Sequence, residues 1–139
     1  MLKIQHLQDI EWIHPGDAAL DLAHPDYSYG EYLKTWDRKH LPVRAGFTPS
    51  VFKLRRLGMK VQQHCFRQPH VPDRDREFVA YSVKGVTDFD ENAGELVLKF
   101  EKGEFGEQRL ADESLEKIYS WDLFRELGAS AMIFNSLRP

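Results

Sequence analysis

The chain has 139 residues, of which 42% are hydrophobic and 29% charged, and a formal net charge of −3 at pH 7, which is typical of one soluble globular domain and excludes disorder over its whole length. Its single cysteine, Cys65, excludes an internal disulfide and a zinc site built from several cysteines of one chain. It has no apolar run near the roughly 20 residues that span a bilayer and no signal-peptide core at its start, so we expect no membrane anchor and no secretion.

Residues 1–46 are expected to form an N-terminal arm with little regular structure. Short apolar runs at residues 2–7 and 10–13 predict two short strands. Residues 15–30 are rich in proline, glycine and aspartate, which favours an irregular path along the rest of the chain. Residues 30–40 place apolar side chains three to four positions apart, and the proline that soon follows predicts that this short helix ends there.

The clearest strand signal lies in residues 47–57, FTPSVFKLRRL. Two apolar side chains, Phe52 and Leu54, alternate with cations at a period of two, which is typical of a half-buried strand. The opposite face would carry Lys53 and Arg55 into solvent or onto a partner.

The predicted core, residues 47–139, continues with strands and helices. The segments expected after the first strand are a second strand at residues 57–65, a helix at 72–84 with Gly85 as its C-cap, a turn at 88–94, a strand at 95–101, and helices at 112–119 and 120–137. Ser120 is a suitable N-cap for the last helix. Gly128 costs that helix roughly 1 kcal/mol relative to alanine, so we expect close packing there. Together these segments predict an α+β fold, in which a small antiparallel sheet packs with about three helices and the irregular N-terminal arm.

The charges are strongly segregated along the chain. Residues 1–33 carry a net charge of −5, residues 34–76 carry +8, and residues 77–139 carry −6. Such segments can neutralise one another within the fold, or they can neutralise neighbouring subunits in an assembly.

No pattern in the sequence indicates a catalytic or metal site. The nucleophile motif G-x-S-x-G, the phosphate-binding P-loop and the dinucleotide motif G-x-G-x-x-G are all absent. His64, Cys65 and His70 do not form the ligand pairs of structural zinc. Residues 88–99 imitate the start of a calcium-binding loop but have alanine at the sixth position and lysine at the twelfth. We therefore predict no enzyme activity, no cofactor and no bound metal.

Nucleic acid is the less favoured partner. Lys53, Arg55, Arg56 and Lys60 cluster near aromatic residues, and such cations can neutralise phosphates while aromatic rings stack on bases. The strand alternation, however, places Phe52 on the face opposite the flanking cations.

Three stretches resemble a loose group of small proteins encoded among the structural genes of tailed bacteriophages. They are the acidic lead-in and short helix of residues 17–41, the F-x-L-R-x-L strand within residues 48–57, and the turn, strand and terminal helix of residues 83–102 and 121–137. The resemblance implies a virion component of the capsid, the head-to-tail connector or the tail, which acts through protein contacts. Residues 57–70 depart from the pattern, because a helix is expected directly after that strand.

A virion role makes other virion proteins the expected partners, with copies of the chain itself among the candidates, and it implies assembly in the host cytoplasm. Arg55 and Arg56 would give direction to the contacts, because the guanidinium fork matches a carboxylate. The predicted interface residues are Tyr27, Tyr29, Trp36, Lys53, Arg55, Arg56 and Trp121. The alternative functions are a tail-assembly chaperone, which would be missing from finished particles, and a small nucleic-acid-binding module.

Overall fold

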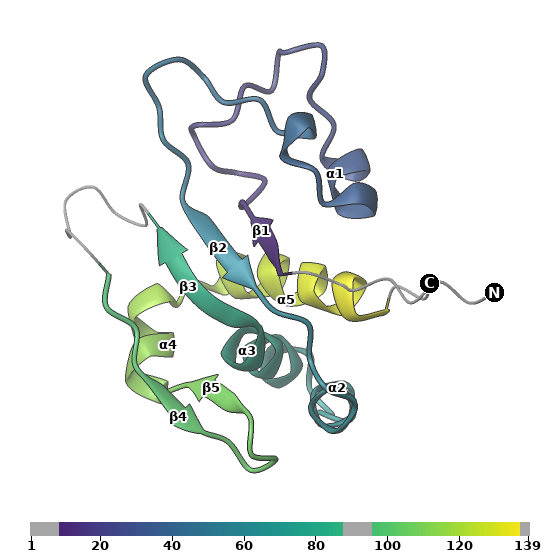
Figure 1. The fold of residues 1–139 in the computed structure, drawn as a ribbon, viewed down its shortest axis with the longest axis vertical. Coiled ribbons are helices and arrows are strands. Elements are labelled where there is room, and N and C mark those ends of the chain that lie inside the picture. Colours follow the sequence, from purple (N-terminus) through teal and green to yellow (C-terminus); the bar gives the residue numbers. More distant parts are fainter. Residues whose placement is uncertain (1–8, 88–95, 137–139) are drawn as a thin grey trace.

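The computed structural model describes residues 9–87 and 96–136, and it shows an α+β fold with two small antiparallel sheets (Figure 1). The larger sheet has the order β1-β2-β3, formed by Ile10–Trp12, Val51–Leu54 and Val83–Thr87. The smaller sheet pairs β4, Phe100–Lys102, with β5, Gln108–Leu110. These elements confirm the predicted fold class. The strand expected at residues 2–7 and the turn expected at 88–94 lie outside the described residues.

The helices of the described part of the chain are α1 Tyr29–Thr35, the 3-10 helix η1 Arg38–His40, α2 Met59–Phe66, α3 Val71–Ser82, α4 Asp112–Ile118 and α5 Trp121–Ser136. Helix α3 packs on α5, and α5 crosses behind the larger sheet in Figure 1. The core is continuous between sheet and helices and includes Phe52 and Leu54 of β2, Phe78 of α3, and Leu127 of α5.

The predicted alternation along β2 is confirmed. Phe52 and Leu54 are buried, whereas Lys53 between them is exposed. Lys53 lies opposite Glu11 on β1 and Gly85 on β3 in the antiparallel register. The larger sheet therefore buries one face and presents a charged row on the other.

The strand predicted at residues 57–65 is wrong, because this segment forms helix α2. Leu57, Val61 and Cys65 are all buried and lie four positions apart, which is the spacing of one helical face. Gly58 is the N-cap, and its carbonyl accepts a hydrogen bond from the Gln62 backbone N–H. The helical spacing of these three buried residues therefore decides the conformation of the segment.

The helix predicted at residues 72–84 is observed as α3, but its predicted C-cap Gly85 is wrong. The helix ends at Ser82, and Val83 takes an extended conformation that begins β3 without an intervening turn. Gly85 lies inside that strand, opposite Lys53. Pairing with β2 satisfies the backbone here, so no glycine cap is needed.

The later part of the chain follows the prediction more closely. Of the strand expected at residues 95–101, only the end is regular, because β4 begins at Phe100. Helices α4 and α5 confirm the two predicted closing helices. The Ser120 hydroxyl accepts a hydrogen bond from the backbone N–H of Leu123 at 3.0 Å, which is the capping contact expected of it.

Candidate functional site

The aromatic residues predicted as anchors in the N-terminal arm are used inside the fold. The Tyr29 hydroxyl donates a hydrogen bond to the carbonyl oxygen of Ile13 at 2.6 Å, just beyond edge strand β1. The Trp36 ring packs edge-on against Phe134 of α5, with 5.5 Å between ring centroids. Tyr27 is partly buried against the same core. These contacts join the arm to the sheet and to α5, and they leave little of these rings for a partner.

Of the basic residues predicted as contacts, Arg55 already makes hydrogen bonds within its own chain. The Arg55 Nε atom donates to the carbonyl oxygen of Tyr81 at 2.7 Å, and its guanidinium also reaches the carbonyl of Gln108. Arg55 therefore ties the β4–β5 hairpin to the end of α3. Arg56 is partly buried, whereas Lys53 is exposed.

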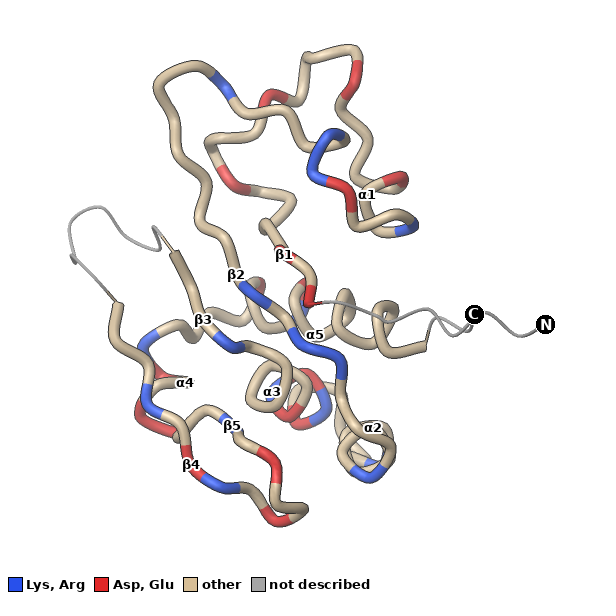
Figure 2. The backbone as a smooth tube through the Cα atoms, viewed as in Figure 1, with Lys and Arg blue, Asp and Glu red and all other residues tan. Residues whose placement is uncertain are grey.

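Figure 2 shows that the basic segment lies among acidic residues from both ends of the chain. Arg38 pairs with Glu11 at 2.9 Å, and Arg76 pairs with Asp112 at 2.7 Å. Charges from residues 34–76 are thus neutralised in part by the two acidic segments within one chain.

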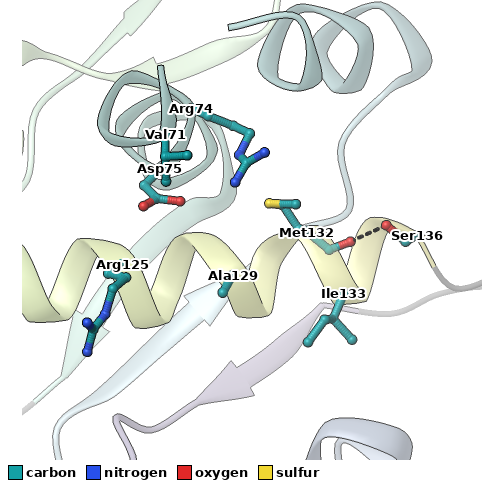
Figure 3. A pocket seen from close by; sticks show the side chains of 8 residues that line it. All are labelled: Val71, Arg74, Asp75, Arg125, Ala129, Met132, Ile133 and Ser136. Atoms are coloured by element: carbon teal, nitrogen blue, oxygen red, sulfur yellow. Dashed lines mark hydrogen bonds between the residues drawn. The ribbon is translucent and has the colours of Figure 1, made fainter. Parts of the chain in front are cut away.

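Trp121 is 60% exposed at the start of α5 and borders a surface groove between α3 and α5. We define the α3–α5 groove as two adjoining pockets of about 480 and 200 Å³, which share Asp75 and Arg125. Figure 3 shows the larger pocket, with Val71, Arg74 and Asp75 on α3; of the α5 side chains, Met132 points toward α3, whereas Arg125 and Ile133 point away from it. Its lining residues are Val71, Arg74, Asp75, Arg125, Ala129, Met132, Ile133 and Ser136.

Helix α5 forms one side of the groove, because it carries apolar side chains on its outer face as well as on the face that packs in the core. Its inner face buries Leu127 and Phe134 in the core. Its outer face has Trp121, Ala129 and Ile133 at multiples of four residues, and Ile133 is 39% exposed. A helix that only covers a core would be polar on that outer face.

The two helices approach closely at Gly128, as the sequence predicted. A Cβ atom on Gly128 would lie 2.9 Å from the Cα of Asp75 and 2.8 Å from its Oδ1. The absence of a side chain at Gly128 therefore lets Asp75 sit at the floor of the groove.

Asp75 is the unusual residue of this groove. It is only 7% exposed, and no hydrogen bond or ion pair from any described residue reaches its carboxylate. Burial raises the pKa of the Asp75 carboxyl, while the Arg74 and Arg125 guanidinium groups act in the opposite direction. Its carboxylate oxygens are not among the fully buried side-chain atoms that lack a partner in the described residues, and Asp75 lines both pockets, so the carboxylate meets the groove rather than a dry core.

Neither neighbouring arginine forms an ion pair with Asp75. Arg125 pairs with Asp122 at 3.0 Å and with Glu126 at 3.4 Å. Arg74 has a buried Nε atom without a hydrogen-bond partner among the described residues. Among the residues that line the two pockets, Asp73 and Asp75 stand against Arg74, Arg76 and Arg125, a net charge of +1. This surface combines apolar side chains with charges of both signs.

The histidine and cysteine flagged in the sequence are part of the packing between α2 and α3. His64 Nε2 lies 3.2 Å from Glu77 Oε1, and its ring packs against Phe105. Cys65 is fully buried, and burial raises the pKa of its thiol to about 12. Within residues 9–87 and 96–136, no group of three or more His, Cys, Asp or Glu side chains could hold a metal ion. No helix in the same ranges is long and apolar enough to cross a bilayer.

Comparisons with family models, with curated proteins and with solved structures find no match to this chain. Of the predicted interface residues, Trp121 is the one that the structure places in it. Sequence reasoning missed Asp75 and Ile133, although the spacing of four between Arg125, Ala129 and Ile133 was a signal of a second face on α5.

Proposed function

We propose that this protein works by binding other proteins in an assembly, that the α3–α5 groove is its docking surface, and that it is not an enzyme. The observation that carries the proposal is the exposed apolar outer face of α5, where Trp121 is 60% and Ile133 39% exposed, beside the two pockets that share Asp75. Exposed apolar patches of this kind mark interaction sites. A partner that covers the groove would remove this apolar surface from water.

The resemblance to tailed-phage structural proteins supplies the setting that we propose. In a phage particle the protein would be a component of the capsid, the head-to-tail connector or the tail. Apolar burial would hold it in place, while charged side chains would set its orientation. Its partners would be other virion proteins, and assembly would take place in the host cytoplasm.

The protein content of purified particles tests this proposal. We expect the wild-type chain in the particles, and we expect Ile133→Glu to be lost from them because a carboxylate would enter the apolar part of the groove. The matched control is Leu22→Glu in the N-terminal arm, where Leu22 is 63% exposed and distant in sequence from the groove. This control should be incorporated normally.

Two outcomes would count against the proposal. Absence of the wild-type chain from finished particles, together with its presence during assembly, would favour the tail-assembly chaperone. Normal incorporation of Ile133→Glu would show that the groove is not the docking surface. A nucleic-acid role has weaker support. Arg55 already donates hydrogen bonds to two backbone carbonyls of its own chain, so its guanidinium is less available to a phosphate.

A further inference from the structure

We propose that the occupant of the α3–α5 groove is a second copy of this chain, related by a two-fold rotation, so that Trp121 of each copy enters the larger pocket of the other. The inference rests on the proposed function and names the partner at the same site. A contact in which both copies use the same surface is isologous, and it closes as a dimer. The protein would therefore join an assembly as a dimer.

The larger pocket, of about 480 Å³, has the chemistry of a site for an aromatic ring. Its apolar lining residues are Val71, Ala129, Met132 and Ile133. Arg74 forms no ion pair with any described residue, and its buried Nε atom has no hydrogen-bond partner among them. A guanidinium attracts the face of an aromatic ring, and tryptophan is the strongest partner in such contacts.

The same surface offers such a ring at its other end. Trp121 borders the smaller pocket and is 60% exposed. The ring of its neighbour Tyr119 already packs edge-on against Phe124, with 5.0 Å between centroids. Trp121, in contrast, has no ring contact within residues 9–87 and 96–136. Tryptophan is among the residues that contribute most to binding when an interface buries them, so Trp121 is the expected anchor.

The charges of the groove complement those of a second copy. Outside the residues that the two pockets share, each pocket has one charged side chain without an ion pair to a described residue, Arg74 in the larger and Asp73 in the smaller. Arg76 of the smaller pocket is already paired with Asp112 at 2.7 Å. A two-fold rotation about an axis between the pockets places Arg74 of each copy toward Asp73 of the other. A partner with charges of one sign would meet a like charge in one of the two pockets.

A single chain cannot fill its own larger pocket with Trp121. Trp121 and Ile133 both belong to α5, which is one continuous helix. A rise of 1.5 Å per residue separates these two positions by about 18 Å along its axis. The ring can therefore reach such a pocket only on another molecule.

The test measures the native mass of the full chain by light scattering behind size exclusion, over a wide concentration range. The wild type should form a dimer. Trp121→Ala removes the ring, and Ile133→Glu puts a carboxylate into the apolar lining, so each should raise the dissociation constant about thirtyfold or more. An equimolar mixture of the two variants should associate more tightly than either alone. In the mixed dimer, Trp121 of the Ile133→Glu chain meets the intact pocket of the Trp121→Ala chain, which restores one of the two contacts.

A second pair of variants tests the charges. Arg74→Glu brings like charges together in both contacts of its own dimer, and Asp73→Lys does the same with the opposite sign. Each should weaken association about tenfold. In a mixed dimer of these two variants, both contacts again join opposite charges, so an equimolar mixture should return to nearly the wild-type dissociation constant.

The results that would overturn the inference are separate from those that bear on the proposed function. A wild-type chain that is monomeric at every concentration excludes the dimer, while particle composition still decides the docking role. A dimer that Trp121→Ala does not weaken, or mixtures that associate no better than the single variants, would exclude this face as the contact between copies. Leu22→Glu should associate like the wild type, and circular dichroism should show that every variant is folded.

Discussion

Gly128 lies where α5 meets α3, and replacing it with alanine tests this contact directly. The new Cβ would lie 2.9 Å from the Cα of Asp75, and backbone at this distance cannot rotate away as a side chain can. Either α3 or α5 would have to shift. Because the floor of the candidate groove is built on this approach, the substitution also tests the geometry of the site.

The expected effect is the difference between two opposing contributions. Alanine improves helix propensity over glycine by about 1 kcal/mol. Forcing an extra methyl group into a tight contact costs about 1–3 kcal/mol. We therefore expect Gly128→Ala to lower the free energy of unfolding by about 1 kcal/mol, which for a domain of this size lowers the Tm by about 4 °C.

The matched control is Gly30→Ala in α1, because a Cβ on Gly30 would have no other atom within 4 Å. This variant should be more stable than the wild type by about 0.5 kcal/mol, since only the propensity contribution acts. Urea unfolding followed by circular dichroism measures both variants. If Gly128→Ala were stabilised as much as Gly30→Ala, the close approach of α3 and α5 would be refuted.

The remaining predictions concern two buried titratable groups. Burial raises the pKa of the Cys65 thiol to about 12 against an ordinary 9.0, so a thiol-reactive dye should label the folded protein only as fast as it opens, and immediate labelling would contradict this. Burial also raises the pKa of the Asp75 carboxyl above its ordinary 3.8, so the folded state keeps this proton to higher pH and the ionised form lowers stability above that raised pKa. Asp75→Asn should therefore raise the urea midpoint at pH 7, and the gain should disappear near pH 3; an equal gain at both pH values would exclude the charge as its cause.

Local signals in the sequence were sufficient for elements with a clear alternation of apolar and polar residues or with a capping residue at their start. The alternation around Lys53 placed β2, and the hydroxyl of Ser120 marked the start of α5. Strand β3 was missed because Val83 follows α3 without a glycine or proline between them. Helix α2 was misread because its apolar residues were weighed as a run, although their spacing of four indicated a helix.

The sequence did not indicate which of the tryptophan side chains would be exposed. Trp36 and Trp121 both lie at the end of a helix among apolar neighbours, yet Trp36 packs against Phe134 while Trp121 is 60% exposed. The difference depends on where α1 meets α5, which is a tertiary contact between segments about 100 residues apart in sequence. Local periodicity cannot contain that information.

Asp75 and the outer face of α5 have a common explanation in the proposed assembly. In an isolated chain, burial raises the pKa of the Asp75 carboxyl and so lowers stability where it is ionised, and exposed Trp121 and Ile133 leave apolar surface in water. A partner that covered the groove would remove that apolar surface from water. Residues that oppose folding stability tend to occur at functional sites. Asp75→Asn, which we expect to fold better at pH 7, would show in one protein whether the carboxylate serves docking rather than stability.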